Sequence, residues 1–397
     1  MVAKYRSVLS VGGALRLFAS ALVGRLPQGM SSLAILLLVR GATHSYAAAG
    51  VAVGAFALAT AGCAPLVGRL IDRFGRARVL VPFALAQSGA YTGLVLATSA
   101  GAGVLALVGL SAVAGTLLPP IAPVVRVLLR EVFDDPALRD TAYALDAVAQ
   151  ETIWIAGPLL VALVIALTSP EFAVVLLAFV GVSGTLLFVS SPLVRRSDAP
   201  RALPRRRSAL ASPDLRALLG PVALTGMALG AIEVGLPSLA IHAGSRPASG
   251  LLLALWSVGS MTGGLWYGSR VWRSSLVSRY QLLLVLAVVC TAPLIAARTI
   301  DVAIVCAVLA GLTVAPVFSC QYALVGRSFS VGGPGTQTEA FTWVAAALMA
   351  GLSAGSALGG VLAGGLGVSA PFVAACAAMG FAALAAVRVR VSAQPAV

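Results

Sequence analysis

The sequence predicts an all-α membrane protein built from twelve transmembrane helices in two six-helix bundles. Hydrophobic residues form 59% of the 397 positions, charged residues form only 10%, and the mean hydropathy is +1.00. A soluble domain averages about 25% charged residues, so this composition places much of the surface in lipid. The apolar residues also gather into twelve stretches that are each long enough to cross a bilayer, which takes about 20 helical residues.

Short polar or basic segments separate the twelve stretches. The expected spans cover residues 14–40, 47–68, 79–99, 102–125, 141–167, 172–193, 216–241, 248–268, 280–298, 302–325, 339–365 and 370–388. All basic residues except Arg25, Arg40, Arg246 and Arg298 fall at one set of span ends, as the positive-inside rule requires of cytoplasmic segments. Both termini are therefore expected in the cytoplasm. The same rule explains the net charge of +14, so no nucleic-acid partner is expected.

The chain is expected to divide at a basic, proline-containing linker. This gives an N-terminal bundle at 1–194, a cytoplasmic linker at 195–215 and a C-terminal bundle at 216–397. A weak repeat relates the two bundles. Ala114-Gly115, followed by Pro120, recurs as Ala310-Gly311, followed by Pro316. Spans four and ten thus resemble each other.

The loop between the second and third spans carries a specific motif. Residues 68–78 read Gly-Arg-Leu-Ile-Asp-Arg-Phe-Gly-Arg-Ala-Arg. This spacing resembles the loop 2–3 signature of the major facilitator superfamily (MFS). The resemblance implies a secondary transporter with two pseudo-symmetric six-helix bundles around a central pathway. With its twelve spans, the chain is similar to the bacterial drug or solute:proton antiporters of that superfamily.

The resemblance also implies a gate at the cytoplasmic ends of the helices. In the superfamily, the acidic residue of this loop, here Asp72, lies against the start of span eleven when the protein opens outward, where the helix dipole stabilises it. Arg73 and Arg76 are expected to pair with acids at the inner end of span four, such as Glu131; setting topology alone is the alternative. The expected gate consists of Gly68, Asp72, Arg73, Gly75, Arg76, Arg126, Glu131 and Glu339.

Spans five and eleven carry small residues at helix-packing spacing. The superfamily's antiporter motif ends in Gly-Pro-x-x-Gly-Gly, of which span five keeps only Gly157 and Pro158. Span eleven comes closer to the motif, with Gly351, Gly355, Gly359 and Gly360. Small residues four positions apart let helices approach closely, so tight packing between the halves is expected from these positions.

Ionisable residues inside the spans are the main functional candidates. A charge inside a bilayer costs at least a few kcal/mol, so such groups face a cavity or a partner. Arg25 and Glu151 lie at matched depths, about 15 Å into spans one and five, and are expected to pair. A carboxyl balanced between burial and a nearby Arg can release its proton when substrate competes for the pair. Glu151, then Glu233 and Asp146, are the candidates for proton coupling; a static structural pair is the alternative.

Polar and aromatic residues from several spans are expected to line the pathway. Apolar walls with few polar groups suit drug-like solutes. The expected lining consists of Arg25, Gln28, Gln150, Trp154, Trp256, Gln321, Tyr322, Phe341 and Trp343. For each aromatic residue, packing or lipid contact is the alternative.

Motifs for catalysis or for a bound cofactor do not occur in the sequence. It contains no Gly-x4-Gly-Lys-Ser/Thr phosphate loop, no Ser/His/Asp set and no paired hydrolytic acids. The five cysteines are scattered without metal-ligand spacing. No enzyme activity, metal or cofactor is therefore expected.

Three functions are compatible with these features. The first is proton-coupled efflux of small, partly apolar solutes by alternating access. The second is import or facilitated passage of a polar or anionic metabolite, which Arg25 would serve. The third is a non-transporting membrane scaffold or receptor, which the midspan charges disfavour. The excess of Arg over Lys, with abundant Ala, indicates a GC-rich bacterial genome, hence a multi-pass protein of the plasma (inner) membrane. We expect a monomer whose partners are solute, protons and lipid.

Overall fold

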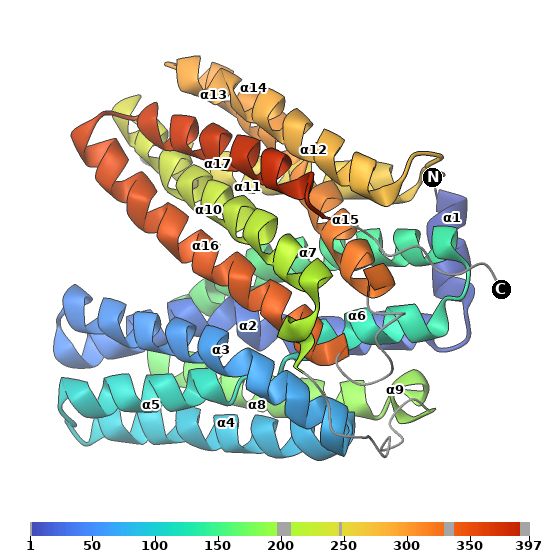
Figure 1. The fold of residues 1–397 in the computed structure, drawn as a ribbon. Helices are drawn as coiled ribbons and strands as arrows, with labels where there is room; N and C mark the ends of the chain where they lie inside the picture. Colours follow the sequence, from blue (N-terminus) through green and yellow to red (C-terminus); the bar gives the residue numbers. More distant parts are fainter. Residues whose placement is uncertain (1, 197–207, 246–247, 329–336, 390–397) are drawn as a thin grey trace. The chain divides into compact units, whose positions relative to one another are not determined.

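Helices are the only regular secondary structure among the residues that the structure describes. A computed structural model describes residues 2–196, 208–245, 248–328 and 337–389 (Figure 1). Eleven helical segments are long and apolar enough to cross a membrane, and the twelfth expected span is a shorter apolar helix of 17 residues. That length is the lower limit for a bilayer-crossing helix. The predicted fold class is confirmed, whereas the cytoplasmic side of the termini stays a prediction.

The helices follow the expected spans in order. The first part of the chain forms α1 (Val2–Ser10), α2 (Ala14–Thr43), α3 (Tyr46–Phe74), α4 (Arg76–Ser99), α5 (Val104–Thr116), α6 (Ile121–Val132), α7 (Pro136–Leu167), α8 (Pro170–Val189) and α9 (Pro192–Arg196). The later part forms the short 3-10 helix η1 (Ala209–Ala211), α10 (Pro213–His242), α11 (Ala248–Gly268), α12 (Leu276–Thr291), α13 (Pro293–Ala296), α14 (Ile300–Gly311), α15 (Val314–Ser328), α16 (Gln337–Gly365) and α17 (Ala370–Ala386). Most of the predicted linker, residues 197–207, lies outside the described residues.

Spans four and ten, expected to be continuous, are each interrupted in the structure. Span four divides into α5 and α6 before Pro119 and Pro120, which lack the backbone N–H that a continuing helix needs. Span ten divides into α14 and α15 directly after Gly311. The repeated Ala-Gly pairs therefore occupy the last turn before each break.

The same glycines set a close helix contact in each repeat. A Cβ added at Gly115 would overlap the backbone of Phe56 in α3, and one added at Gly311 would overlap the backbone of Trp256 in α11. Only a residue without a side chain fits such an approach. The repeat seen in the sequence thus corresponds to equivalent packing of helix on helix.

The described residues form two compact units. Unit 1 comprises those within Met1–Val8, Phe133–Glu151 and Arg205–Val397, and unit 2 those within Leu9–Val132 and Thr152–Pro204. Helix α7 is therefore shared, because its residues up to Glu151 belong to unit 1 and the rest to unit 2. The predicted division into bundles at the linker stays a prediction.

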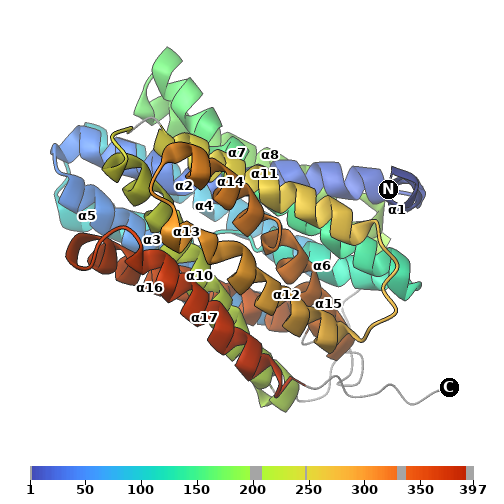
Figure 2. The same ribbon diagram turned by 90° about the horizontal axis from the view of Figure 1, so that it is seen from above.

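Helix α10 is the centre of unit 1. It packs along α16 and α17, while α11 packs on α14 (Figures 1 and 2). Helix α1 is tied to the end of α11, since the Tyr5 hydroxyl donates to the carbonyl oxygen of Leu265 at 2.6 Å. Burial raises the pKa of Tyr5 to about 12, so this hydroxyl keeps the proton that it donates.

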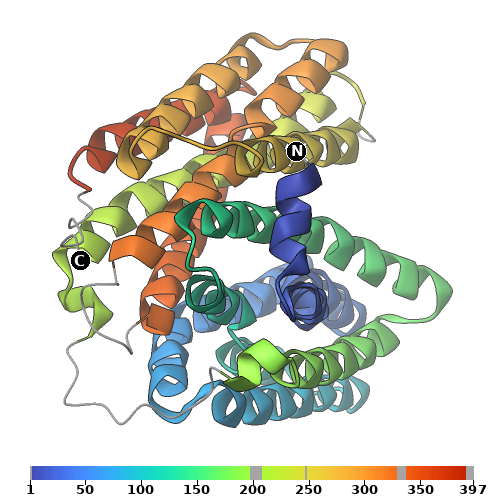
Figure 3. The same ribbon diagram turned by 90° about the vertical axis from the view of Figure 1, so that its right-hand side faces the viewer.

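In unit 2, α2 packs on α8 and α3, and α4 packs on α8 and α5 (Figures 1 and 3). Glycines allow the backbones of α2 and its neighbours to touch. A Cβ added at Gly157 of α7 would lie 2.5 Å from the carbonyl carbon of Gly29. A Cβ added at Gly184 of α8 would lie 2.7 Å from the Cα of Gly24.

The small residues of α16 act in the same way inside unit 1. Added Cβ atoms at Gly351 and Gly355 would overlap the carbonyl groups of Ala223 and Met227 in α10. Gly359 also approaches α10, but a Cβ at Gly360 would meet nothing within 4 Å among the described residues. These close approaches occur within each unit, and the tight packing that the sequence predicts between the halves stays a prediction.

Candidate functional site

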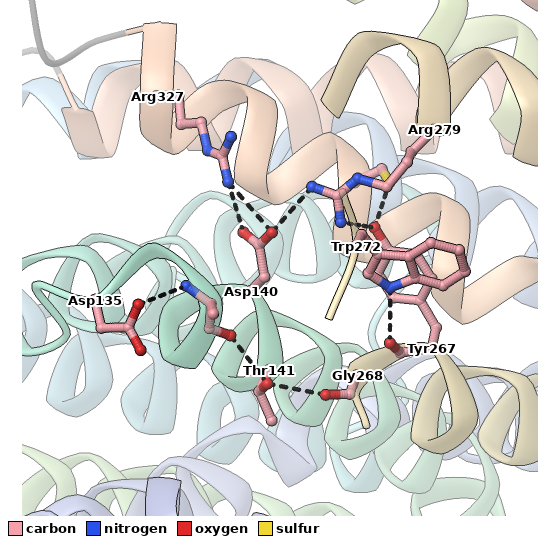
Figure 4. A network of polar contacts seen from close by, with 10 residues as sticks. Asp135, Asp140, Thr141, Tyr267, Gly268, Trp272, Arg279 and Arg327 are labelled. Atoms are coloured by element: carbon pink, nitrogen blue, oxygen red, sulfur yellow. Dashed lines mark hydrogen bonds and ion pairs between the residues drawn. The ribbon is translucent and has the colours of Figure 1, made fainter. Parts of the chain in front are cut away.

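One charged cluster joins three helices of unit 1 near their ends (Figure 4). Asp140 of α7 accepts hydrogen bonds from Arg279 of α12 at 3.1 Å and from Arg327 of α15 at 3.2 and 3.3 Å. The side chain of Arg279 is only 6% exposed and that of Asp140 17%. A single carboxylate thus neutralises two guanidinium groups, one of them almost fully buried.

Tyr267 of α11 completes this cluster. Its hydroxyl accepts a hydrogen bond from Arg279 at 3.0 Å and is hydrogen-bonded to the buried thiol of Cys320 at 2.9 Å. Its ring stacks on Trp272, whose indole N–H donates to the Tyr267 carbonyl at 3.1 Å (Figure 4). We call Asp140, Tyr267, Arg279, Cys320 and Arg327 the Asp140 cluster. It fastens the first turns of α7 to α11, α12 and α15.

Contacts along α7 and α11 continue inward from this cluster. The Thr141 hydroxyl donates to the Gly268 carbonyl at 2.8 Å. One turn further on, a Cβ added at Gly268 would lie 2.5 Å from the Cβ of Ala144, and one added at Gly264 would lie 2.9 Å from a methyl group of Val148. The helices therefore run antiparallel in direct contact, with glycines of α11 against small or branched residues of α7.

The next turn of this contact holds Glu151. Its side chain is 7% exposed and lies beside the hydroxyl of Ser260, which is 1% exposed. The two groups are neighbours, but their geometry falls short of a formed hydrogen bond. The carboxyl of Glu233 in α10 is close enough for its charge to repel that of Glu151, and its side chain is exposed. The structure thus brings together the two carboxyls that the sequence ranks first and second for proton coupling.

The other buried ionisable residues occupy both units. Asp146 is 0% exposed in unit 1, and Arg25 is 3% exposed in unit 2. Because Arg25 and Glu151 fall in different units, their pairing stays a prediction. The neighbours Gln28 and Gln150 are half-buried and buried, respectively.

The loop 2–3 motif is built around one glycine. Gly75 adopts a φ of 94°, which non-glycine residues rarely reach, and it forms the one-residue turn between α3 and α4. Directly after it, Arg76 donates to both carboxylate oxygens of Glu131 in α6 at 2.9 Å. This is the ion pair expected from the sequence. The guanidinium of Arg73 lies instead 5.0 Å from the ring centre of Phe74.

The remaining gate residues are placed as follows. Gly68 and Arg126 are buried and Asp72 is half-buried in unit 2. Glu339, in the first turn of α16, is 2% exposed and accepts hydrogen bonds from Ser208 at 2.6 Å and from the indole of Trp343 at 3.4 Å. The contact expected between Asp72 and the start of α16 stays a prediction.

Loss of the Glu131 carboxylate is expected to destabilise the fold. Glu131→Gln removes the carboxylate that the nearly buried Arg76 contacts, so the free energy of unfolding falls by about 1–3 kcal/mol. Thermal melting of the purified protein measures this loss. Asp134→Asn, at an exposed position between α6 and α7, is the control and leaves the melting temperature unchanged. Equal melting temperatures for both variants would show that the pair contributes nothing.

The aromatic and amide residues expected in the pathway have varied surroundings. The amide nitrogen of Gln321 donates to Tyr280 at 3.1 Å and to Thr225 at 3.3 Å, so this side chain ties α15 to α12 and α10. Tyr322 is buried and its ring stacks on Phe318. The others range from fully buried to half-exposed: Phe341 at 1%, Trp256 at 8% and Trp154 at 39%.

Sequence reasoning missed the Asp140 cluster. Asp140 sits one position before the expected span five, where an acid resembles an ordinary loop residue. Its partners are 139 and 187 positions away, so no local spacing points to them. One available signal was that Arg279 and Arg327 each lie within three residues of an apolar span, where a long cationic side chain reaches toward a partner or the interface.

Comparison with known proteins agrees with this architecture. The family model described as Major Facilitator Superfamily matches residues 17–338. No sequence among the curated proteins matches the chain. The crystal structure of the human organic anion transporter MFSD10 (TETRAN) superposes with a TM-score of 0.74 at 18% identity, covering 94% of this chain and 99% of that chain.

A second solved structure is similar over the same extent. A bacterial homologue of the iron transporter ferroportin, in an outward-facing state, superposes with a TM-score of 0.75 at 13% identity, covering 94% of this chain and 98% of that chain. At such low identity these likenesses show the fold alone. The family match covers most of the chain. The chain belongs to the Major Facilitator Superfamily.

Proposed function

We propose that this chain is a proton-coupled transporter that exports small, partly apolar solutes by alternating access. The observation that carries the proposal is the burial of Glu151 beside Glu233, inside helices long and apolar enough to span a membrane. A carboxylate costs at least a few kcal/mol at such a position, and a protein that only needed a scaffold would gain by replacing it. The cost is explained if Glu151 must take up and release a proton during transport.

Glu151 would work by competition. When solute occupies the pathway, it displaces the groups that contact the Glu151 carboxyl. Glu151 then takes up or releases a proton. Opening to the other side then exchanges the proton with water there. Arg25 is the proposed partner of Glu151 in this cycle, and Glu233 and Asp146 rank behind Glu151 as carriers.

The Asp140 cluster would act as the latch of the cytoplasmic side. It connects α7, whose second half belongs to unit 2, with three helices of unit 1. Breaking its ion pairs would free the first half of α7 from α12 and α15. In unit 2, the Arg76–Glu131 pair and Asp72 are among the proposed cytoplasmic gate residues. We further propose a monomer in a bacterial plasma membrane, with both termini in the cytoplasm.

A specific observation supports a second candidate, the passage of an anionic metabolite. Arg25 is a buried cation in α2, and one protein of similar fold is an organic anion transporter. In this case Arg25 would bind the solute, and Glu151 would adjust the strength of that binding. The two candidates differ in the sign of charge on the solute.

The experiment is transport into or out of proteoliposomes under an imposed pH gradient. We expect Glu151→Gln to abolish accumulation driven by protons while counterflow of solute down its gradient persists. The matched control is Glu171→Gln, an exposed acid of α8. Full proton-driven accumulation by Glu151→Gln would exclude Glu151 as the carrier. No flux of any solute by the unmodified protein would favour a scaffold or receptor.

A further inference from the structure

We propose that Glu151, Glu233, Ser260 and Trp256 form a recognition site for an organic cation, such as a protonated amine attached to an apolar body. This inference rests on the proposed transport function and names the class of its solute. It assigns to Ser260 and Trp256 of α11 a role in specificity. We call these four residues the Glu151 site.

Helix packing fixes the place of the site. Gly268 and Gly264 of α11 lie against Ala144 and Val148 of α7, each pair about one turn further from the Asp140 cluster. The next turn on both helices brings Ser260 to Glu151. Trp256 follows one further turn along α11, on the same face as Ser260, because residues four apart on a helix lie above one another.

The site contains two acids, and no basic residue lies within two turns of either of them along α7, α10 or α11. Arg139, the nearest basic residue before Glu151 on α7, precedes it by twelve positions, or about 18 Å at 1.5 Å per residue. His242 follows Glu233 on α10 by nine positions, or about 13 Å on the same geometry. Span residues 248–268 of α11 contain no charge, and Asp146 adds a further acid to α7. Along these three helices the sequence supplies no balancing charge, so a proton or a cationic solute would stabilise the two carboxyls.

Three unused hydrogen-bond donors lie on the same two helices, α7 and α11, as Glu151 and Ser260. The hydroxyl of Ser260, the indole N–H of Trp256 and the amide nitrogen of Gln150 have no hydrogen-bond partner within the described parts of the chain. They are 1%, 8% and 6% exposed, respectively. A buried polar group left without a partner is costly, so a bound solute that carries an acceptor next to its charge would satisfy them.

The chemistry favours an organic cation over a metal ion or an anion. Among the described residues no group of three or more His, Cys, Asp or Glu side chains is arranged to hold a metal. An ammonium group presents three donors, which match two carboxylates and a hydroxyl. The ring of Trp256 adds attraction for a cation and apolar contact for the rest of the solute. An anion would be repelled by both acids.

The test measures binding of two matched pairs of probes to the purified full-length protein in lipid nanodiscs. One pair is 2-phenylethylammonium and 3-phenylpropionate, which share a ring and chain but differ in charge. The other is tetraphenylphosphonium and tetraphenylborate. We expect at least one cation to bind with an affinity about tenfold or more above that of its anion. Glu233→Gln is expected to weaken the cation about tenfold and Ser260→Ala several-fold.

Three further variants make this test specific. Glu233→Asp keeps the charge and is expected to retain cation binding within a few-fold, which separates charge from folding. Asp301→Asn and Ser353→Ala remove the same groups at exposed positions of unit 1, in α14 and α16, and are expected to bind like the unmodified protein. Thermal melting identifies any variant that fails to fold.

Several results would overturn the inference. They are failure of both cations to bind, preference for the anions, and unchanged cation affinity in folded Glu233→Gln and Ser260→Ala. The proposed function fails separately: cation binding at this site without proton-driven accumulation would reject proton coupling and retain the site.

Discussion

Asp140→Asn is expected to cause the largest loss of stability from a single polar substitution in this chain. Asparagine keeps the shape of the side chain but leaves Arg279, 6% exposed, and Arg327 without their shared countercharge. Breaking a largely buried ion pair costs about 3–5 kcal/mol, and partial exposure of Asp140 and Arg327 reduces this to about 2–4 kcal/mol. Thermal melting in detergent measures the change.

The same substitution is expected to open the cluster, and a native thiol can report this. Cys320 is fully buried and hydrogen-bonded to Tyr267, so thiol reagents reach it only when the cluster separates. With the other four cysteines replaced by Ala, Asp140→Asn is expected to label at Cys320 about tenfold faster or more, since weakening the latch by 1.4 kcal/mol shifts an equilibrium tenfold.

Asp134→Asn is the control, because Asp134 lies just before α7 and is exposed. It should change neither melting temperature nor labelling. Adding Arg327→Gln to Asp140→Asn removes one of the two guanidinium groups that lost the Asp140 carboxylate and should restore part of the loss, as coupled residues do in a double-mutant cycle. Slow labelling of Cys320 in Asp140→Asn would mean that the cluster is not a latch.

The second large effect is a difference between two glycine substitutions in α16, which are expected to change the stability in opposite directions. Gly355→Ala in α16 would place a methyl group on the carbonyl of Met227 in α10, so the two helices must separate. Overpacking of this kind costs about 1–3 kcal/mol, and more where backbone rather than a side chain must move. Gly360→Ala, five positions later, meets nothing within 4 Å and should stabilise α16 by about 0.5–1 kcal/mol, the ordinary gain over glycine in a helix.

Melting of the two variants, with expression level as a second readout, tests this difference in sign. The prediction depends on the position of the glycine and not on helix propensity, since both changes raise the propensity equally. If Gly355→Ala melted at or above the unmodified protein, the close approach of α16 to α10 would be refuted.

Most of the fold could be predicted because length and apolarity are local properties. Each expected span corresponds to one helix or to two consecutive helices. The breaks before Ile121 and Val314 were harder, although Pro119 and Pro120 precede the first of them. At the second break, Pro316 lies within the first turn of α15, where proline is tolerated and gives no sign of an interruption.

The candidate site was only partly predictable because its members are joined across long separations. Glu151 and Glu233 were recognisable as acids in apolar spans, where a charge is costly and therefore indicates a functional role. Ser260 gave no comparable signal, since a serine in a glycine-rich helix resembles one more small packing residue. Gln321 was expected to face solute, but its amide is used by Thr225 and Tyr280, a choice that only the tertiary structure reveals.

The sharing of α7 between the two units also bears on how the protein is made. Asp140 leaves the ribosome 139 residues ahead of Arg279 and 187 ahead of Arg327, on the order of ten seconds at about 5–20 residues per second. During that interval the nascent chain carries an acid whose partners do not yet exist. The early helices therefore wait in the membrane for the late ones, and neither portion matures as a finished module before translation reaches α15.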